Sequence, residues 1–208
     1  IDTAEMYANG RAEEVIGAAI KDVGENQREN MFIVSKVLPS NAHFDGVIHA
    51  CNHSMRRLNV TFIDMYLLHW RGSTPLQETL DAFMTLQSSG KIRHFGVSNF
   101  NSSDMNDWHN CKEGGALATN QILYNLNHRG VEWDVIPLCK DHSIPVMAYS
   151  PLDQGRLESS PVLAMLAERH RATPLQVALA WVLAQENVIA IPKAVIHHHI
   201  KQNIKALD

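Results

Sequence analysis

The sequence predicts an α/β fold, an incomplete (β/α)8 barrel, and three observations lead to it. Short apolar runs typical of strands alternate with amphipathic helical patterns along the 208 residues. Each strand is followed by a single helix, which indicates a parallel sheet built of βα units. Six full strands, one partial strand and seven helices come close to the eight units of a barrel. A doubly wound open sheet is the alternative.

The individual elements are placed by the spacing of their apolar residues, which recur at i, i+3 and i+4 in the helices. Strands are expected at 31–36, 62–69, 92–98, 116–121, 146–149 and 188–193, with the tail of an earlier strand at 1–3. Helices are expected at 12–22, 44–58, 75–89, 102–110, 131–141 and 174–185, and a last one from about His198.

Local signals support several of these boundaries. Thr74-Pro75 and Thr173-Pro174 each place a cap residue before a first-turn proline. Gly90 follows a predicted helix at the position where a left-handed residue is needed. No low-complexity linker interrupts the pattern, so we expect one domain over residues 1–208.

Composition and charge exclude several classes of protein. A net charge of −4 and a pI near 6.3 give no electrostatic reason to expect nucleic acid or an anionic membrane as partner. No apolar run reaches the roughly 18 residues that a spanning helix needs. Cys51, Cys111 and Cys139 are odd in number and form no Cys-x-x-Cys pair, which is typical of a reduced, cytoplasmic protein.

Polar residues follow most of the predicted strands directly. Because the carboxyl ends of all strands meet on one face of a (β/α)8 barrel, these residues are expected to converge on one pocket. One of them alone is more typical of a solvated rim, but their shared placement favours a site. They are Asp2, Lys36, His69, Ser98 with Asn99, Gln121, Tyr149 with Ser150, and Lys193.

Four side chains in this set and its neighbouring loop are suited to carbonyl reduction. Hydride transfer builds negative charge on the carbonyl oxygen, which must then receive a proton. Tyr7 can donate it, but an ordinary tyrosine pKa is about 10, so a nearby ammonium is needed to lower it. We expect Lys36 to supply that ammonium, with Asp2 as its counter-ion. His69 is expected to orient the carbonyl oxygen or to share the proton relay.

Seven short motifs follow one another along the whole chain: Asp2-Thr-Ala-Glu-Met-Tyr7, Ser35-Lys36, Leu68-His69-Trp70, Gly96-Val-Ser98-Asn99, Asn120-Gln121, Ala148-Tyr149-Ser150-Pro151-Leu152 and Ile191-Pro192-Lys193. In this order they resemble the aldo-keto reductase family. The resemblance implies a (β/α)8 barrel, NADPH as hydride donor, and a catalytic tetrad. Matched residue by residue, that tetrad falls on Asp2, Tyr7, Lys36 and His69.

The resemblance also implies contacts to the cofactor and the substrate. Ser98, Asn99 and Gln121 match residues that hold the nicotinamide carboxamide, and Tyr149 matches the aromatic ring stacked on the nicotinamide. The pyrophosphate contacts match Ser150, Leu152 and Gln154. Lys193 matches a ligand of the adenosine 2′-phosphate, His199 stands at a second such position, and Gln202 and Asn203 match residues near the adenine. Trp70 is expected to contact the substrate.

Two residues depart from the family pattern around the 2′-phosphate. Ala194 stands where many relatives carry a hydroxyl, and His199 stands where many carry arginine. A neutral imidazole holds a phosphate more weakly than a guanidinium, so these two residues are expected to weaken the preference for NADPH over NADH. The run His197-His198-His199 is not expected to be a metal site, because consecutive residues on a helix point about 100° apart.

The family's first strand and first helix would precede Asp2, and its C-terminal tail would follow Asp208. We therefore expect the chain to be part of a longer reductase. Without the first βα unit the sheet has open edges and apolar side chains lose their partners. The isolated 208-residue chain is expected to be aggregation-prone or partly unfolded, with little activity.

Within the family, residues 1–7 and 66–73 look closest to bacterial-type reductases of methylglyoxal and other small aldehydes, with diketogluconate reductases nearby. We expect a monomer that acts on a small carbonyl compound.

Two alternatives remain open. One is a non-catalytic relative that binds the cofactor as a redox sensor or regulatory subunit, although a pure sensor would not need all four tetrad groups. The other is a metal-dependent barrel hydrolase or isomerase, which needs acidic and histidine ligands at several strand ends. Only Asp2 and His69 qualify as such ligands.

Overall fold

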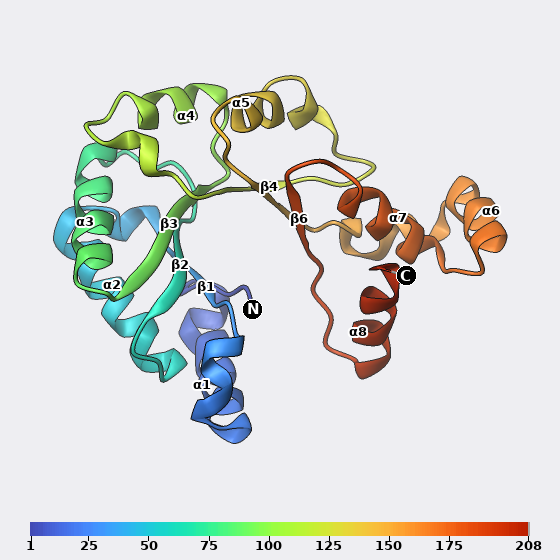
Figure 1. The fold of residues 1–208 in the computed structure, drawn as a ribbon, viewed down its shortest axis with the longest axis horizontal. Coiled ribbons are helices and arrows are strands. Elements are labelled where there is room, and N and C mark those ends of the chain that lie inside the picture. The colour runs from blue at the N-terminus through green and yellow to red at the C-terminus, as the bar shows by residue number, and fades with distance from the viewer. Residues whose placement is uncertain (208) are drawn as a thin grey trace. The chain divides into compact units, whose positions relative to one another are not determined.

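A computed structural model describes residues 1–207 of the chain, apart from the side chains of residues 25, 26 and 116 (Figure 1). Residues Ile1–Thr119 form one compact unit, and Asn120–Asp208 form a second. Single strands alternate with helices in both. Among the described residues, no helix is long and apolar enough to cross a membrane.

The first unit carries three parallel strands, β1 (Val34–Val37), β2 (Ile63–Leu68) and β3 (Ile92–Ser98). Every residue of β1 and β2 is buried, as expected for parallel strands that are covered on both faces. Asp2 forms an isolated parallel bridge with Val34, so the start of the chain lies along the outer edge of β1.

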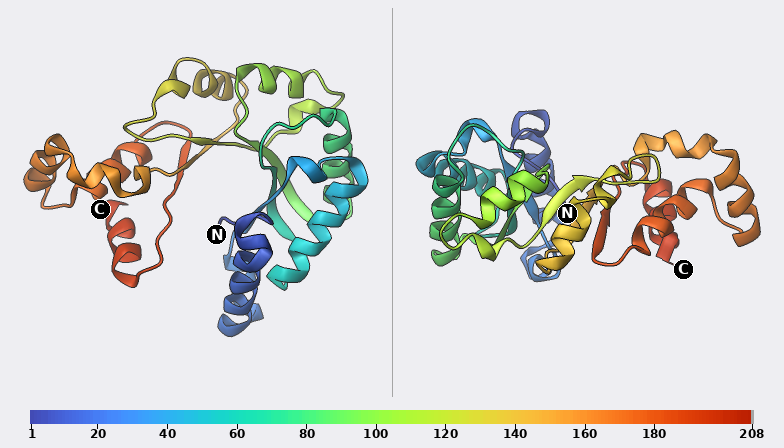
Figure 2. Two further views of the ribbon diagram at one scale, coloured as in Figure 1. Left: turned by 180° about the vertical axis from the view of Figure 1, so that it is seen from behind. Right: turned by 90° about the horizontal axis from the view of Figure 1, so that it is seen from above.

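Four helices belong to the first unit: α1 (Arg11–Val23), α2 (Phe44–Leu58), α3 (Leu76–Ser88) and α4 (Ser102–His109). α2 and α3 lie side by side along one face of the strands (Figures 1 and 2). α1 and α2 approach closely at Gly17, where a Cβ atom would stand 2.3 Å from the carbonyl oxygen of Arg57. Glycine is therefore required at this helix crossing.

The second unit carries the parallel strands β4 (Asn120–Leu123), β5 (Val146–Tyr149) and β6 (Val188–Ile191). Its core includes Tyr124, Ala148 and Val182. Its helices are α5 (Val135–Asp141), α6 (Pro161–His170), α7 (Pro174–Leu183) and α8 (His197–Ile204). Short 3-10 helices in the two units lie at Tyr7–Gly10, Glu25–Asn30, Pro39–Asn41, Gly114–Ala116, Gly130–Glu132, Asp153–Ser159 and Lys205–Leu207.

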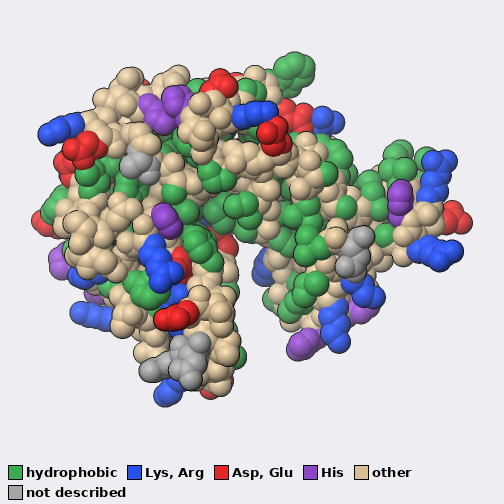
Figure 3. All heavy atoms as spheres, in the orientation of Figure 1, with side chains coloured by type: hydrophobic (Ala, Val, Ile, Leu, Met, Phe, Trp, Pro, Cys, Tyr) green, Lys and Arg blue, Asp and Glu red, His purple; other side chains and the backbone are tan. Residues whose placement is uncertain are grey.

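Apolar side chains reach the surface of both units (Figure 3). Phe32 is 50% exposed in the first unit, and Ile204 is 60% exposed in the second.

Several sequence-based boundaries are confirmed. The strands at 92–98 and 146–149 and the helix at 44–58 have the predicted ends. Thr173 caps α7, since its hydroxyl accepts from the N–H of Gln176 while the Gln176 side chain accepts from the N–H of Thr173. Gly90 has the expected left-handed backbone, with φ of 73°.

Other boundaries were wrong. α3 begins at Leu76, and its N-cap is Pro75 rather than Thr74. The strand expected at 116–121 lies at Asn120–Leu123. The one expected at 31–36 begins only at Val34, and the one expected at 188–193 ends at Ile191. Residues that flank two of these strands still hydrogen-bond to the neighbouring strand: the Ile33 carbonyl accepts from the N–H of Met65 at 3.0 Å, and the Thr119 carbonyl accepts from the N–H of Val97 at 3.0 Å.

Helix α6 was missed altogether. Its start signal was present in the sequence: Ser160 is followed by Pro161, and the Ser160 hydroxyl accepts from the N–H of Leu163. The expected helix at 131–141 is split, because a 3-10 turn at Gly130–Glu132 precedes α5, which starts at Val135.

Candidate active site

Lys36 is the centre of a polar cluster in the first unit. It is the third residue of β1, and its side chain is fully buried. Its Nζ atom donates to Asp2 Oδ1 at 2.6 Å, to the carbonyl oxygen of Thr3 at 2.9 Å and to the Tyr7 hydroxyl at 3.4 Å. These three contacts use all three ammonium protons. Burial lowers the pKa of Lys36, and the Asp2 carboxylate acts in the opposite direction.

The backbone near the N-terminus brings Asp2 and Tyr7 to Lys36. The N–H of Thr3 donates to the carbonyl of Val34 at 2.9 Å, which fixes Asp2 beside β1. Tyr7 opens a 3-10 turn in which Ala8 and Asn9 have positive φ angles of 50° and 54°. Its ring lies 5.0 Å from Lys36 Nζ, and its side chain is partly open to solvent. The structure therefore brings together the predicted carboxylate of Asp2, ammonium of Lys36 and phenol of Tyr7.

The pKa of Tyr7 corrects one sequence-based expectation. Lys36 was expected to lower it, but the pKa is raised to about 12, first by burial and then by the charge of Asp2. The physical reason is that burial and the charge of Asp2 both disfavour the tyrosinate, and Lys36, whose Nζ lies 3.4 Å from the hydroxyl and 2.6 Å from Asp2, does not outweigh them. The phenol consequently keeps its proton throughout the neutral range, which is the form that a proton donor needs.

His69 follows β2 and is 7% exposed. Its ring meets the ring of Tyr7 edge-on at 5.6 Å and lies 4.9 Å from the ring of Trp70, which is 38% exposed. Burial, and next the charge of Lys36, lower the pKa of His69 to about 4. The imidazole is therefore neutral near pH 7, so it is better suited to donate a hydrogen bond than to transfer a proton as an acid.

Ser98 and Asn99 stand at the end of β3. Asn99 has a positive φ of 59°, and its side-chain amide donates to the His69 carbonyl at 3.1 Å and to the Ser98 hydroxyl at 3.2 Å. The ends of β2 and β3 are thus tied together next to His69. A hydroxyl and a carboxamide offer both donors and acceptors, which fits the carboxamide of a nicotinamide.

The other predicted cofactor residues belong to the second unit: Tyr149 and Ser150 lie at the end of β5, whereas Gln121, expected at a strand end, is the second residue of β4. Gln121 in β4 is 2% exposed, and its amide nitrogen lies 3.9 Å from the sulfur of Met147. Tyr149 is the last residue of β5. Ser150 follows with a positive φ of 49°, and its carbonyl accepts from the Asn125 side chain at 2.9 Å.

The loop after β5, which contains Leu152 and Gln154, is anchored by a residue that sequence reasoning missed. Asp153 is 3% exposed and accepts from Asn127 at 2.8 Å and from Arg156 at 2.6 Å. The Arg156 and Asn127 hydrogen bonds hold the pKa of Asp153 at about 2. The Asp-x-x-Arg spacing was the available signal, because it allows a local ion pair.

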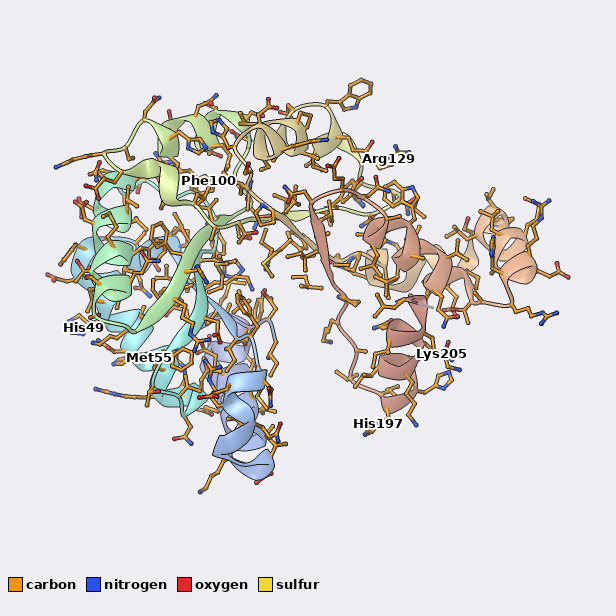
Figure 4. The ribbon with its side chains drawn as sticks, in the orientation of Figure 1. His49, Met55, Phe100, Arg129, His197 and Lys205 are labelled. Carbon is orange, nitrogen blue, oxygen red and sulfur yellow. The ribbon has the colours of Figure 1, made fainter. Side chains whose placement is uncertain are left out.

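The remaining predicted residues lie on or before α8. Lys193 and His199 are exposed, while Gln202 and Asn203 are half-buried. The carbonyl of Gln202 accepts from the Gln176 side chain at 3.1 Å, which ties α8 to α7. Figure 4 labels His197 at the start of α8 and Lys205 just past its end. In the part of the chain that the structure describes, no three His, Cys, Asp or Glu side chains are grouped to hold a metal ion.

A second missed residue lies behind the tetrad. Glu13 on α1 is fully buried, accepts from the Ser35 hydroxyl at 2.6 Å and pairs with Arg57 at 2.6 Å. It ties α1 to β1 and α2, one residue away from Lys36. Its signal was its place on the apolar face of α1, four residues before Gly17 and seven before Ile20.

Comparison with known proteins decides the family. The aldo/keto reductase family model matches residues 1–208. The chain belongs to the aldo-keto reductases. A methylglyoxal reductase of Escherichia coli, YeaE, is 46% identical over the whole chain, which covers 74% of that protein. A glyoxal reductase of Bacillus subtilis is 36% identical, with 72% of its length covered.

Solved structures of aldo-keto reductases agree. A Klebsiella pneumoniae enzyme in complex with NADP and acetate superposes with a TM-score of 0.96 and 47% identity, and the chain covers 74% of it. A second Klebsiella structure, in complex with NADPH, gives 0.95 at the same identity. The fold is therefore part of the aldo-keto reductase barrel rather than an open doubly wound sheet, and the chain is an oxidoreductase of this family.

Proposed function

We propose that the protein reduces aldehydes or ketones to alcohols with NADPH, and that Tyr7 donates the proton. The observation that carries this proposal is the position of Lys36 Nζ, 2.6 Å from Asp2 and 3.4 Å from the Tyr7 hydroxyl. A buried ammonium next to a protonated phenol is suited to deliver a proton to a carbonyl oxygen and to stabilise the tyrosinate left behind. Members of the same family that resemble this chain are named as reductases of methylglyoxal and glyoxal.

Bound NADPH would supply the hydride. As the carbonyl oxygen gains negative charge, the Tyr7 hydroxyl transfers its proton to that oxygen and becomes tyrosinate. An alkoxide is a much stronger base than a tyrosinate, so this transfer is favourable even though the pKa of Tyr7 is raised to about 12. Lys36 then stabilises the tyrosinate, since its ammonium is preorganised and cannot be shielded by water at full burial.

Asp2 and His69 have supporting roles in this proposal. Asp2 keeps Lys36 charged and oriented despite its burial. His69 is neutral and faces the Tyr7 ring, so it can donate a hydrogen bond that orients the carbonyl oxygen. The Trp70 side chain is partly exposed and lies next to His69, so its ring offers an apolar surface to the substrate.

Cofactor contacts are proposed from the donor chemistry of each residue. Ser98, Asn99 and Gln121 would hold the nicotinamide carboxamide, and Tyr149 would stack on the ring. The loop after β5 would contact the pyrophosphate through Ser150, Leu152 and Gln154. Lys193, with His199, would bind the 2′-phosphate, and Gln202 and Asn203 would lie near the adenine. The Klebsiella relatives that bind NADP and NADPH support the choice of cofactor.

We infer that the substrate is a small carbonyl compound such as methylglyoxal, which the resemblance to the Escherichia coli methylglyoxal reductase YeaE supports. Cys51, Cys111 and Cys139 are free thiols, which favours a reduced compartment such as the cytoplasm. The net charge of −4 supports neither nucleic acid nor an anionic membrane as partner. A monomeric state stays a prediction.

The test is oxidation of NADPH by the purified full-length protein with methylglyoxal as substrate, with cofactor binding followed separately by tryptophan fluorescence. Reductase activity that requires both compounds and yields the alcohol in a 1:1 ratio to NADPH oxidised is the expected result. Tight NADPH binding without oxidation of the cofactor by methylglyoxal or a nitrobenzaldehyde would instead favour a cofactor-binding subunit.

A further inference from the structure

Glu5 lies inside the turn that joins Asp2 to Tyr7, yet its carboxylate is directed away from both. Its Oε1 atom accepts from the backbone N–H of Leu38 at 2.7 Å and from the Asn41 side-chain amide at 3.0 Å. Leu38 follows the last residue of β1, and Asn41 ends the 3-10 helix Pro39–Asn41. One carboxylate oxygen thus joins the turn that carries Tyr7 to the segment that leaves β1.

These hydrogen bonds close a short loop of the chain that includes Tyr7 and Lys36. Glu5 is two residues before Tyr7, and Leu38 is two residues after Lys36. The backbone N–H of Glu5 also donates to the Lys36 carbonyl, at a longer 3.4 Å. The Glu5 hydrogen bonds therefore join two segments of the chain close to the reacting groups. Only a few residues lie between these bonds and either Tyr7 or Lys36.

The turn needs such an anchor. Ala8 and Asn9, directly after Tyr7, both have left-handed backbones, which L-residues adopt only when their surroundings compensate. Tyr7 is itself 36% exposed, so packing of its ring does not fix it fully. A charged acceptor makes stronger hydrogen bonds than a neutral one, and the two bonds to Glu5 supply this restraint.

We propose that Glu5 is a positioning residue for the reaction: its hydrogen bonds to Leu38 and Asn41 set the placement of the Tyr7 hydroxyl against Lys36. The inference rests on the proposed function, in which Tyr7 donates the proton. A misplacement of about 1 Å in a reacting group can cost about a hundredfold in rate. Loss of the anchor is therefore expected to lower kcat without removing any group that touches the cofactor.

The test compares Glu5→Ala, Glu5→Gln and the control Glu14→Ala, which removes an exposed carboxylate on α1. Glu5→Ala is expected to lower kcat for methylglyoxal about tenfold to a hundredfold, with KM and the NADPH Kd changed less than about threefold. Glu5→Gln keeps an acceptor oxygen and is expected to recover most of kcat. Glu14→Ala should match the unmodified protein.

Full kcat in a folded Glu5→Ala variant would overturn the inference, as would a folded Glu5→Gln variant that is no better than Glu5→Ala. If Glu5→Ala does not fold, Asn41→Leu decides, because it removes only one of the two hydrogen bonds. It should lower kcat severalfold with KM unchanged, and a kcat equal to that of the unmodified protein would again overturn the inference.

Tyr7→Phe, measured in parallel, separates this inference from the proposed function. A Tyr7→Phe variant without activity, together with a fully active Glu5→Ala variant, refutes only the role of Glu5. An active Tyr7→Phe variant refutes the proposed function itself.

Discussion

The Lys36 ammonium lies 2.6 Å from Asp2 Oδ1 and is completely buried in the first unit. A buried cation is stable only when it is paired, and Asp2 is its partner. Because the Tyr7 hydroxyl is 0.8 Å farther from Nζ than Asp2 is (3.4 against 2.6 Å), Lys36 leaves the pKa of the phenol raised. The rise comes from burial and from Asp2, and Lys36 acts against it, so its proposed role is to stabilise the tyrosinate that forms during the reaction.

Lys36→Met is expected to lower kcat by about a thousandfold or more, since the charge that stabilises the tyrosinate is lost. Asp2→Asn is expected to cost less, because it removes only the partner of that charge. Steady-state kinetics of both variants at saturating NADPH check this order. The roles assigned to the two residues would be wrong if Asp2→Asn were the more damaging substitution.

Asp2→Asn is also expected to change the pH dependence of the reaction. Burial lowers the pKa of Lys36, and Asp2 opposes that shift. Without Asp2 the pKa falls further, so the ammonium deprotonates at a lower pH. The alkaline limb of the kcat profile should therefore move to lower pH in the variant. An unchanged alkaline limb would show that the profile does not report Lys36.

His69 is expected to contribute a pH-dependent term to stability. Its pKa is lowered from the model-peptide value of 6.5 to about 4, so the unfolded state binds the extra proton between these two values. The contribution of His69 to the free energy of unfolding is therefore complete above pH 6.5 and is lost as the pH falls to about 4. The free energy of unfolding of His69→Gln should decline less steeply in this window than that of the unmodified protein, as denaturant unfolding at several pH values would reveal. Parallel curves for the two proteins would argue against the shifted pKa.

Three members of the proposed tetrad could be placed from sequence because polar residues at the ends of parallel strands converge, and Tyr7 could be placed from the loop that follows Asp2. Lys36 lies near the end of a strand that is apolar enough to recognise, His69 directly follows another, and Asp2 lies in the stub of a third. Their electrostatics could not be predicted in the same way. The pKa of Tyr7 depends on the degree of burial and on a difference between two distances, and neither is encoded in residue spacing.

The roles of Glu5, Glu13 and Asp153 were missed for a related reason. The partners of Glu5 are 33 and 36 residues away, so only the tertiary register brings them together. Glu13 and Asp153 are buried charges, and charged residues are normally read as surface. Helix α6 was missed for a different reason. Its N-cap Ser160 and first-turn Pro161 are recognisable in the sequence but were overlooked. The single domain expected over 1–208 stays a prediction.

Cofactor choice is tested at Lys193. Because NADH lacks the 2′-phosphate, Lys193→Met is expected to weaken NADPH binding by one to two orders of magnitude, about 1.4 to 2.8 kcal/mol, and to leave NADH binding nearly unchanged. Fluorescence titrations with both cofactors measure this. Equal losses for NADPH and NADH would place Lys193 at the pyrophosphate or in a structural role.

Asp153 is expected to hold the loop after β5 in its left-handed conformation, which includes Gln154 at φ of 55°. Asp153→Ala removes the partner of Asn127 and Arg156, so it should weaken NADPH binding and lower the melting temperature by several degrees. Since the pKa of Asp153 is lowered to about 2, its contribution to stability is complete above about pH 4 and is lost as the pH falls toward 2. Calorimetry across that range, with Glu168→Ala as a control that removes an exposed carboxylate on α6, checks the prediction. Unchanged NADPH affinity in Asp153→Ala would separate this loop from the cofactor.

The central claim is that the Tyr7 hydroxyl donates the proton to the carbonyl oxygen. Its most direct test is kcat for methylglyoxal at saturating NADPH in Tyr7→Phe, with Tyr66→Phe as control, because the Tyr66 side chain is fully buried in β2 and cannot reach a substrate. The account predicts that Tyr7→Phe loses at least about a thousandfold in kcat while its NADPH Kd stays within a few-fold, and that Tyr66→Phe stays active. Retention of most of kcat in Tyr7→Phe would contradict it.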